Sequence, residues 1–106
     1  MAKYLIQANY VGQGIKGLLQ DGGSARRAAV EKLAQSMGAS IESFYYAFGD
    51  YDLVMIVDVP DHASMASIVL TVNAGGAVTA KTTVLLTPEE IDAAGKMSPV
   101  YSAPGA

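Results

Sequence analysis

The chain has 106 residues, of which 51% are hydrophobic and only 16% are charged. This length provides for one domain with a modest core. The charged fraction lies well below the roughly 25% of an average globular domain. Because a small domain has proportionally more surface to solvate, the shortage of charge indicates that a second subunit covers part of that surface. We therefore expect a homodimer or a higher homo-oligomer.

Charge, cysteine content and hydropathy exclude several classes of protein. The net charge is −3 and no basic cluster is present, which argues against a nucleic-acid partner. The chain has no cysteine, so disulfides and thiolate metal sites are excluded. The apolar run at the N-terminus is too short for a signal peptide, and the longest uncharged stretch, residues 63–80, holds too many small polar residues to span a membrane. We expect a cytoplasmic protein that does not bind membranes.

The first third of the chain predicts a strand, a loop and a helix. Residues 3–9 are compatible with a strand, and residues 10–23 hold five glycines, which predict a loop with at most one helical turn. Ser24 is a good N-cap for the apolar residues that follow at helical spacing, and Gly38 suits the end of that helix.

The middle of the chain predicts two strands joined by a tight connection. Residues 40–48 are rich in aromatic side chains, and residues 52–59 include the run Leu53–Val57, which is apolar on both alternating faces. A strand of this kind usually lies inside a sheet with a layer on each side. A domain of two layers covers only one face of its sheet. The layer on the other face must then come from outside the domain, and a partner subunit is the simplest source.

Another helix follows Pro60, with Asp61 as its N-cap and the pair Gly75-Gly76 at its end. No charged side chain occurs between His62 and Ala74 if histidine is taken as neutral. We expect a helix with so little charge to be contacted on more than one side.

The last part of the chain predicts a strand, a short helix and a tail. Residues 78–86 alternate threonine with apolar residues, as a strand does. The sequence Thr87-Pro88-Glu89-Glu90 forms a capping box with proline at the first helical position, and the helix that it starts ends near Gly95. Residues 96–106 have no periodicity and form a tail.

This order of elements predicts an α+β domain over residues 1–95 with ferredoxin-like β-α-β-β-α-β topology. The sheet has four antiparallel strands in the order 4-1-3-2, and both helices cover one face. The other face would be bare in a monomer. Two such sheets facing each other would cover it.

The segment Phe44–Val54, FYYAFGDYDLV, resembles the signature of the GYD-domain family, small bacterial proteins named for a Gly-Tyr-Asp run. In this chain Asp50 stands between Gly49 and Tyr51, so the tripeptide is interrupted. The segments Gly22–Arg27 and Lys81–Glu90 are also similar to that family.

The resemblance extends over nearly the whole chain, to about Ala94. It implies a dimeric α/β-barrel arrangement and no particular activity, because the family has no established function. Relatives of the wider fold include cofactor-independent monooxygenases, haem-degrading enzymes and the effector-binding domains of leucine-responsive-type regulators. The fold alone does not choose among these functions.

One candidate ligand site lies at the start of the first long helix. Glycines precede Ser24 there, and Arg26 and Arg27 follow in the first turn. Free backbone N–H groups and two guanidinium groups suit a small anion such as phosphate or a carboxylate. The alternative is that both arginines pair with Asp21, Glu31 or carboxylates of a neighbouring chain.

A second candidate set consists of polar residues on the strands. Alternation places Gln7, Tyr46, Asp58 and Lys81 on the sheet face away from the helices. With the predicted strand order, we expect Lys81 and Asp58 to pair across the strand that carries Gln7. Such a pair is either a tie between subunits or the polar floor of a pocket.

Two further features favour structural roles. Tyr51 and Asp52 could form a proton relay, but an aspartate at the start of a strand more often caps the turn while the tyrosine covers the sheet edge. His62 is the only histidine, and without a second ligand it is a weak candidate for a metal or haem. We expect no metal and no cofactor.

The leading hypothesis is a non-enzymatic domain that binds a small molecule, for example a small anion, or assembles at a subunit interface. Its site would lie between the sheet and a partner chain, and the helix start that carries the two arginines is a second candidate. The alternative is a cofactor-independent enzyme, oxygenase- or isomerase-like, that uses Tyr51, Asp52 or the strand polar set in a cleft between sheet and helices. An enclosed pocket with a titratable residue of perturbed pKa would favour the enzyme. A flat, fully packed interface would favour binding or assembly.

Overall fold

The computed structural model describes residues 1–106 and consists of one four-stranded antiparallel sheet with four helices. The elements in chain order are β1 (Ala2–Tyr10), α1 (Gln13–Asp21), α2 (Gly23–Ser36), β2 (Ser40–Tyr46), β3 (Leu53–Val59), α3 (His62–Ala74), β4 (Val78–Leu85) and α4 (Pro88–Gly95). The strand order is β2-β3-β1-β4, which confirms the predicted ferredoxin-like topology.

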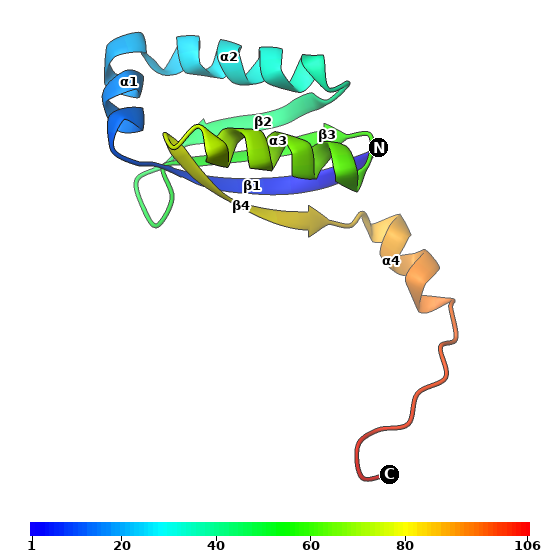
Figure 1. The fold of residues 1–106 in the computed structure, drawn as a ribbon. Coiled ribbons are helices and arrows are strands. Elements are labelled where there is room, and N and C mark those ends of the chain that lie inside the picture. Colours follow the sequence, from blue (N-terminus) through cyan, green and yellow to red (C-terminus); the bar gives the residue numbers. More distant parts are fainter.

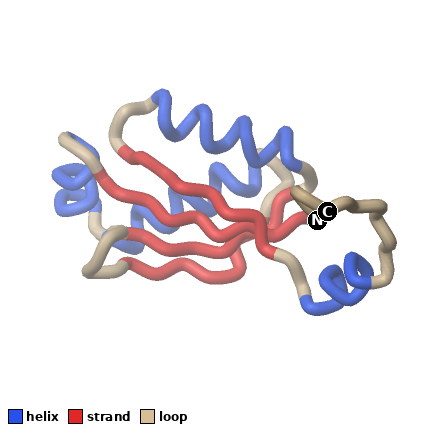
Figure 2. The backbone as a smooth tube through the Cα atoms, turned by 90° about the horizontal axis from the view of Figure 1, so that it is seen from below, coloured by secondary structure: helices blue, strands red, loops and turns tan.

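Helices α2 and α3 cover one face of the sheet, and no element covers the other (Figures 1 and 2). Helix α4 and the tail lead away from the sheet (Figure 1), and every residue of α4 is exposed. None of the helices combines the length and the apolar composition needed to cross a bilayer.

The two faces of the sheet follow from the alternation of side chains along the strands. In β1 the buried residues Tyr4, Ile6 and Ala8 point to the helices, and the pairing with β3 places the buried Leu53 and Val57 on the same side. The uncovered side of the sheet, called the open face below, carries Lys3, Leu5 and Gln7 of β1, Val54, Ile56 and Asp58 of β3, and Lys81, Thr83 and Leu85 of β4.

The core on the helix side is small. Only 9 of the 106 residues are buried, so most apolar side chains retain some exposure. The strands β1 and β3 supply most of the buried residues, whereas α2 contributes Ala34 and α3 contributes Met65. The two helices therefore cover the sheet with few large side chains.

Residues 13–21 form a helix, and the predicted loop in this region is wrong. Four of the five glycines that suggested a loop lie at the ends of the helix or at a close contact, and Gly17 lies in the middle of the helix. Gly12 precedes the helix with φ 53° and Gly22 follows it with φ 87°. A side chain at Gly14 would collide with the backbone carbonyl of Ala77, so glycine lets α1 pack closely there.

The local signals for the other helix ends are confirmed, with one exception. Asp61 accepts a hydrogen bond from the backbone N–H of Ser64 at 2.7 Å, and Thr87 and Glu90 form the reciprocal capping box. The exception is Ser24, which lies inside the first turn of α2 because Gly22 occupies the N-cap position.

Candidate functional site

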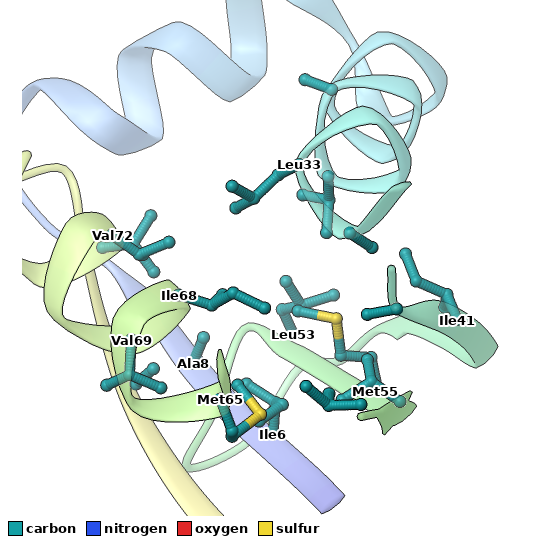
Figure 3. A pocket seen from close by; sticks show the side chains of 18 of the residues that line it. Ile6, Ala8, Leu33, Ile41, Leu53, Met55, Met65, Ile68, Val69 and Val72 are labelled. Carbon is teal, nitrogen blue, oxygen red and sulfur yellow. The ribbon is translucent and has the colours of Figure 1, made fainter. Parts of the chain in front are cut away.

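An apolar cavity of about 140 Å³ lies between the sheet and the helices α2 and α3. Of the 20 residues that line it, 19 are hydrophobic and the remaining one is Arg26. Leu33 of α2 and Ile68 of α3 point into this space from opposite sides, above Leu53 and Met55 of β3 (Figure 3). The cavity is therefore a pocket for apolar groups with one charge in its lining.

The cavity lies between α2 and α3, which contact different strands of the sheet. Helix α2 contacts the edge strand β2, whereas α3 contacts β3 and β4. The central strand β1 carries Ala8 below the gap, and β4 carries Ala80 directly opposite it. These two small side chains leave part of the space above the floor unfilled.

Two tyrosines and Arg26 lie close together beside the start of α2. The hydroxyl of Tyr46 donates a hydrogen bond to the carbonyl oxygen of Gly23 at 2.9 Å. Burial raises the pKa of Tyr46, and the adjacent Tyr10 phenol raises it further, whereas the charge of Arg26 lowers it. Arg26 and Tyr10 both line the cavity, so the cluster adjoins its apolar lining.

The structure separates the two arginines that the sequence grouped in an anion site at the helix start. Arg27 points outward, and its Nε lies 2.9 Å from Oε1 of Glu31, as the alternative interpretation expected. Arg26 instead contributes to the cavity lining, and Ser24 is exposed without a capping bond. Successive residues of a helix project in different directions, which separates the two guanidinium groups.

Gln7, Asp58 and Lys81 lie on the open face as predicted, but the predicted pair of Lys81 with Asp58 is wrong. In the sheet register Lys81 lies opposite Gln7, whereas Asp58 lies opposite Lys3. Lys3 and Gln7 lie four positions apart on β1, which is roughly 13 Å along the strand.

Asp58 instead pairs with Lys3, whose Nζ lies 2.9 Å from Oδ1 of Asp58 and 3.4 Å from Oε1 of Glu42. The hydrogen bond to Asp58 is the main cause of the raised pKa of Lys3. Sequence reasoning missed Lys3, although it is the only lysine of the first predicted strand.

Tyr46 lies on the helix side of the sheet, so its predicted place on the open face is also wrong. A β-bulge shifts the register between Ile41 and Ser43, and beyond it Tyr46 pairs with the buried Leu53. The extra residue reverses the alternation in the second half of β2. Tyr45 takes the open-face position instead, opposite Val54.

Asp52 has the structural role that the sequence favoured. Its Oδ2 accepts a hydrogen bond from the backbone N–H of Tyr10 at 3.0 Å, and its own N–H donates to Oδ1 of Asn9 at 3.1 Å. These bonds tie the β2–β3 connection to the end of β1. The neighbouring Tyr51 is half-buried.

His62 is exposed at the first position of α3, as expected. The hydroxyl of the buried Tyr4 contacts Nδ1 of His62, and no pattern in the sequence predicted this contact. The two rings pack edge to face at a centroid distance of 5.8 Å. No group of three or more histidine, cysteine or acidic residues is placed to hold a metal ion.

These observations define a small ferredoxin-like α+β domain with an apolar cavity between its sheet and its helices. The family model of the GYD domain matches residues 4–94, and the chain belongs to that family. Comparisons with curated proteins and with solved structures give no match.

Proposed function

We propose that this chain is a small-molecule-binding domain that holds an apolar ligand between its sheet and its helices. The observation that carries the proposal is the cavity of about 140 Å³ with 19 apolar residues among the 20 that line it. An engineered apolar cavity of roughly 150 Å³ in another protein stays dry and binds benzene. The present cavity therefore suits a group of about that size.

The free energy of the empty cavity supports the proposal. In a fully enclosed core an unfilled space costs about 24 cal/mol per Å³, so a space of about 140 Å³ that is partly open to solvent costs the fold at most about 3 kcal/mol. A domain of this size has a total stability of roughly 5–15 kcal/mol. A ligand that fills the space recovers part of that cost and stabilises the folded state.

The lining favours binding over the enzymatic alternative. It contains no carboxylate, histidine, lysine or serine, and the Tyr10 phenol is its one hydroxyl group. General acid–base chemistry needs a group of suitable pKa within reach of the substrate. The Tyr51–Asp52 pair does not supply one, because neither residue belongs to the lining and Asp52 is bound to the backbone.

Toluene tests the cavity because it is apolar, uncharged and close to benzene in size. In methyl-detected NMR, toluene should shift the signals of Leu33 and Ile68 and leave those of Leu5 and Ile56 on the open face unchanged. Ala80→Leu should abolish the shifts by filling the floor of the cavity. Thr79→Leu, on the opposite face of the same strand, should retain them. Shifts confined to the open face, or none at saturating toluene, would contradict the proposal.

We propose further that two copies of the chain associate through their open faces. Leu5, Val54, Ile56 and Leu85 give this face an apolar centre, and they are half-buried in the single chain. A second copy offers the same residues, as a two-fold symmetric interface requires. Helix α4 supports the same assembly, since eight exposed residues form a marginal helix in water and gain stability by packing on a partner.

Sedimentation velocity over a range of protein concentrations tests the association. The wild-type chain should sediment as a dimer or larger species at micromolar concentration. Ile56→Asp should shift it to the 11.0 kDa monomer because the substitution places a charge in the apolar centre. A wild-type monomer at the same concentrations would refute this part of the proposal.

A further inference from the structure

We infer that the cavity takes a small carboxylic acid whose apolar body is about the size of one aromatic ring and whose carboxylate binds Arg26. The inference rests on the proposed function and adds the class of ligand. It follows from the position of Arg26, the one charged residue among those that line the cavity.

Arg26 has no negative partner within the chain. The ion pairs of the structure join Lys3 to Glu42 and Asp58, and Arg27 to Glu31. Arg27 is therefore paired although it is the more exposed of the two arginines, whereas the half-buried Arg26 is not. A carboxylate at the end of an apolar ligand would supply the missing charge, with the two parallel hydrogen bonds that a guanidinium group can donate.

The tyrosines beside Arg26 suit the same group. Tyr10 lines the cavity next to Arg26, and a phenol donates a hydrogen bond through its hydroxyl. Tyr46 adjoins both residues, and burial is the main cause of its raised pKa. The hydroxyl of Tyr46 is held by the Gly23 carbonyl, which leaves Tyr10 as the donor that can turn toward a bound carboxylate.

Other ligand charges fit the lining less well. A cationic ligand would meet a guanidinium group and no carboxylate in the lining. A phosphate carries up to two charges and needs more donors than one arginine and one phenol provide. A fully apolar ligand would fill the space but leave the Arg26 charge without a partner. The single positive charge matches a monoanion.

Calorimetric titration of the full chain with 3-phenylpropionate and 3-phenyl-1-propanol tests the charge, because the two probes share the same apolar body. We expect the acid to bind about tenfold more tightly than the alcohol, the size of effect typical of one charge-assisted hydrogen bond. Arg26→Gln should remove this preference, so that the acid and the alcohol bind with similar affinity. Arg27→Gln, one residue away on the same helix, should retain the preference, and Arg26→Lys should retain part of it.

The possible outcomes separate this inference from the proposed function. Equal affinity for acid and alcohol in the wild-type chain would overturn the ligand class and leave the cavity as a binding site. A preference that persists in Arg26→Gln would overturn the role of Arg26. Binding of neither probe to the wild-type chain, together with no response to toluene, would overturn the proposed function itself. Thermal melts of all variants in the absence of ligand establish that each one is folded.

Discussion

Filling the cavity from its floor should stabilise the domain. Ala80 is half-buried on β4, lines the cavity and lies opposite Ala8. Ala80→Leu adds three carbon atoms that can enter a space of about 140 Å³ without displacing the backbone. At about 0.8 kcal/mol per buried methylene, the upper limit of the gain is about 2 kcal/mol.

The assay is thermal and urea unfolding at a fixed protein concentration. For a domain of this size 1 kcal/mol corresponds to about 4–8 °C in Tm, so a gain of half the limit is measurable. Thr79→Leu is the matched control, since it adds an apolar side chain at the preceding position on the opposite face. Its effect on the free energy of unfolding of the monomer should stay within about 0.5 kcal/mol.

A loss of 1 kcal/mol or more in Ala80→Leu would refute the reasoning. Inserting methylenes into a core without free space costs typically about 1–3 kcal/mol. Such a loss would therefore mean that the space beside Ala80 is already filled. If both variants were more stable than the wild-type chain, the effect would belong to β4 as a whole and not to the cavity.

Gly14→Ala should destabilise the fold by about 1–3 kcal/mol through overpacking, whereas Gly17→Ala, with no atom within 4 Å of the added carbon, should not. Asp61→Asn tests the pH dependence of stability. The Ser64 N–H lowers the pKa of Asp61 in the folded state. The ionised carboxylate therefore stabilises the fold at pH values above the unfolded-state pKa, and this stabilisation is lost as the pH falls through the folded-state pKa. The Tm of the variant should therefore depend less on pH in that acidic range. Ile56→Asp should unfold at a Tm that no longer rises with protein concentration, and a wild-type-like dependence would contradict the open-face interface.

The parts of the fold that local chemistry determines could be predicted from the sequence. The caps at Asp61 and Thr87 depend on residues three positions apart, and both are present as predicted. The place of β3 inside the sheet followed from its two-sided apolar run and is confirmed. The sequence did not predict helix α1 because Gly14 serves a close contact with Ala77, a residue distant in the sequence.

The candidate site was harder to predict because it depends on register and on how the helices are placed. One bulge in β2 moved Tyr46 to the other face, and an offset of four residues separated Lys81 from Asp58. Neither has a local signal in the sequence. The sequence indicated Arg26 as an anion-binding residue. Its place in the lining of an apolar cavity depends on how α2 and α3 are arranged in the folded chain, which the sequence alone does not show.

The shortage of charge in this chain has two structural causes, although the sequence suggested one. These causes are the apolar cavity and the apolar centre of the open face, and β3 contributes to both. Met55 lines the cavity, and its neighbours Val54 and Ile56 lie at the centre of the open face. A second copy that covers the open face does not reach the cavity, which lies between the sheet and the helices α2 and α3 on the other side. Under the two proposals, filling of the cavity depends on ligand concentration, whereas burial of the open face depends on protein concentration. Titrating the ligand at constant protein concentration, and the protein at constant ligand concentration, therefore tests the two apolar surfaces of β3 separately.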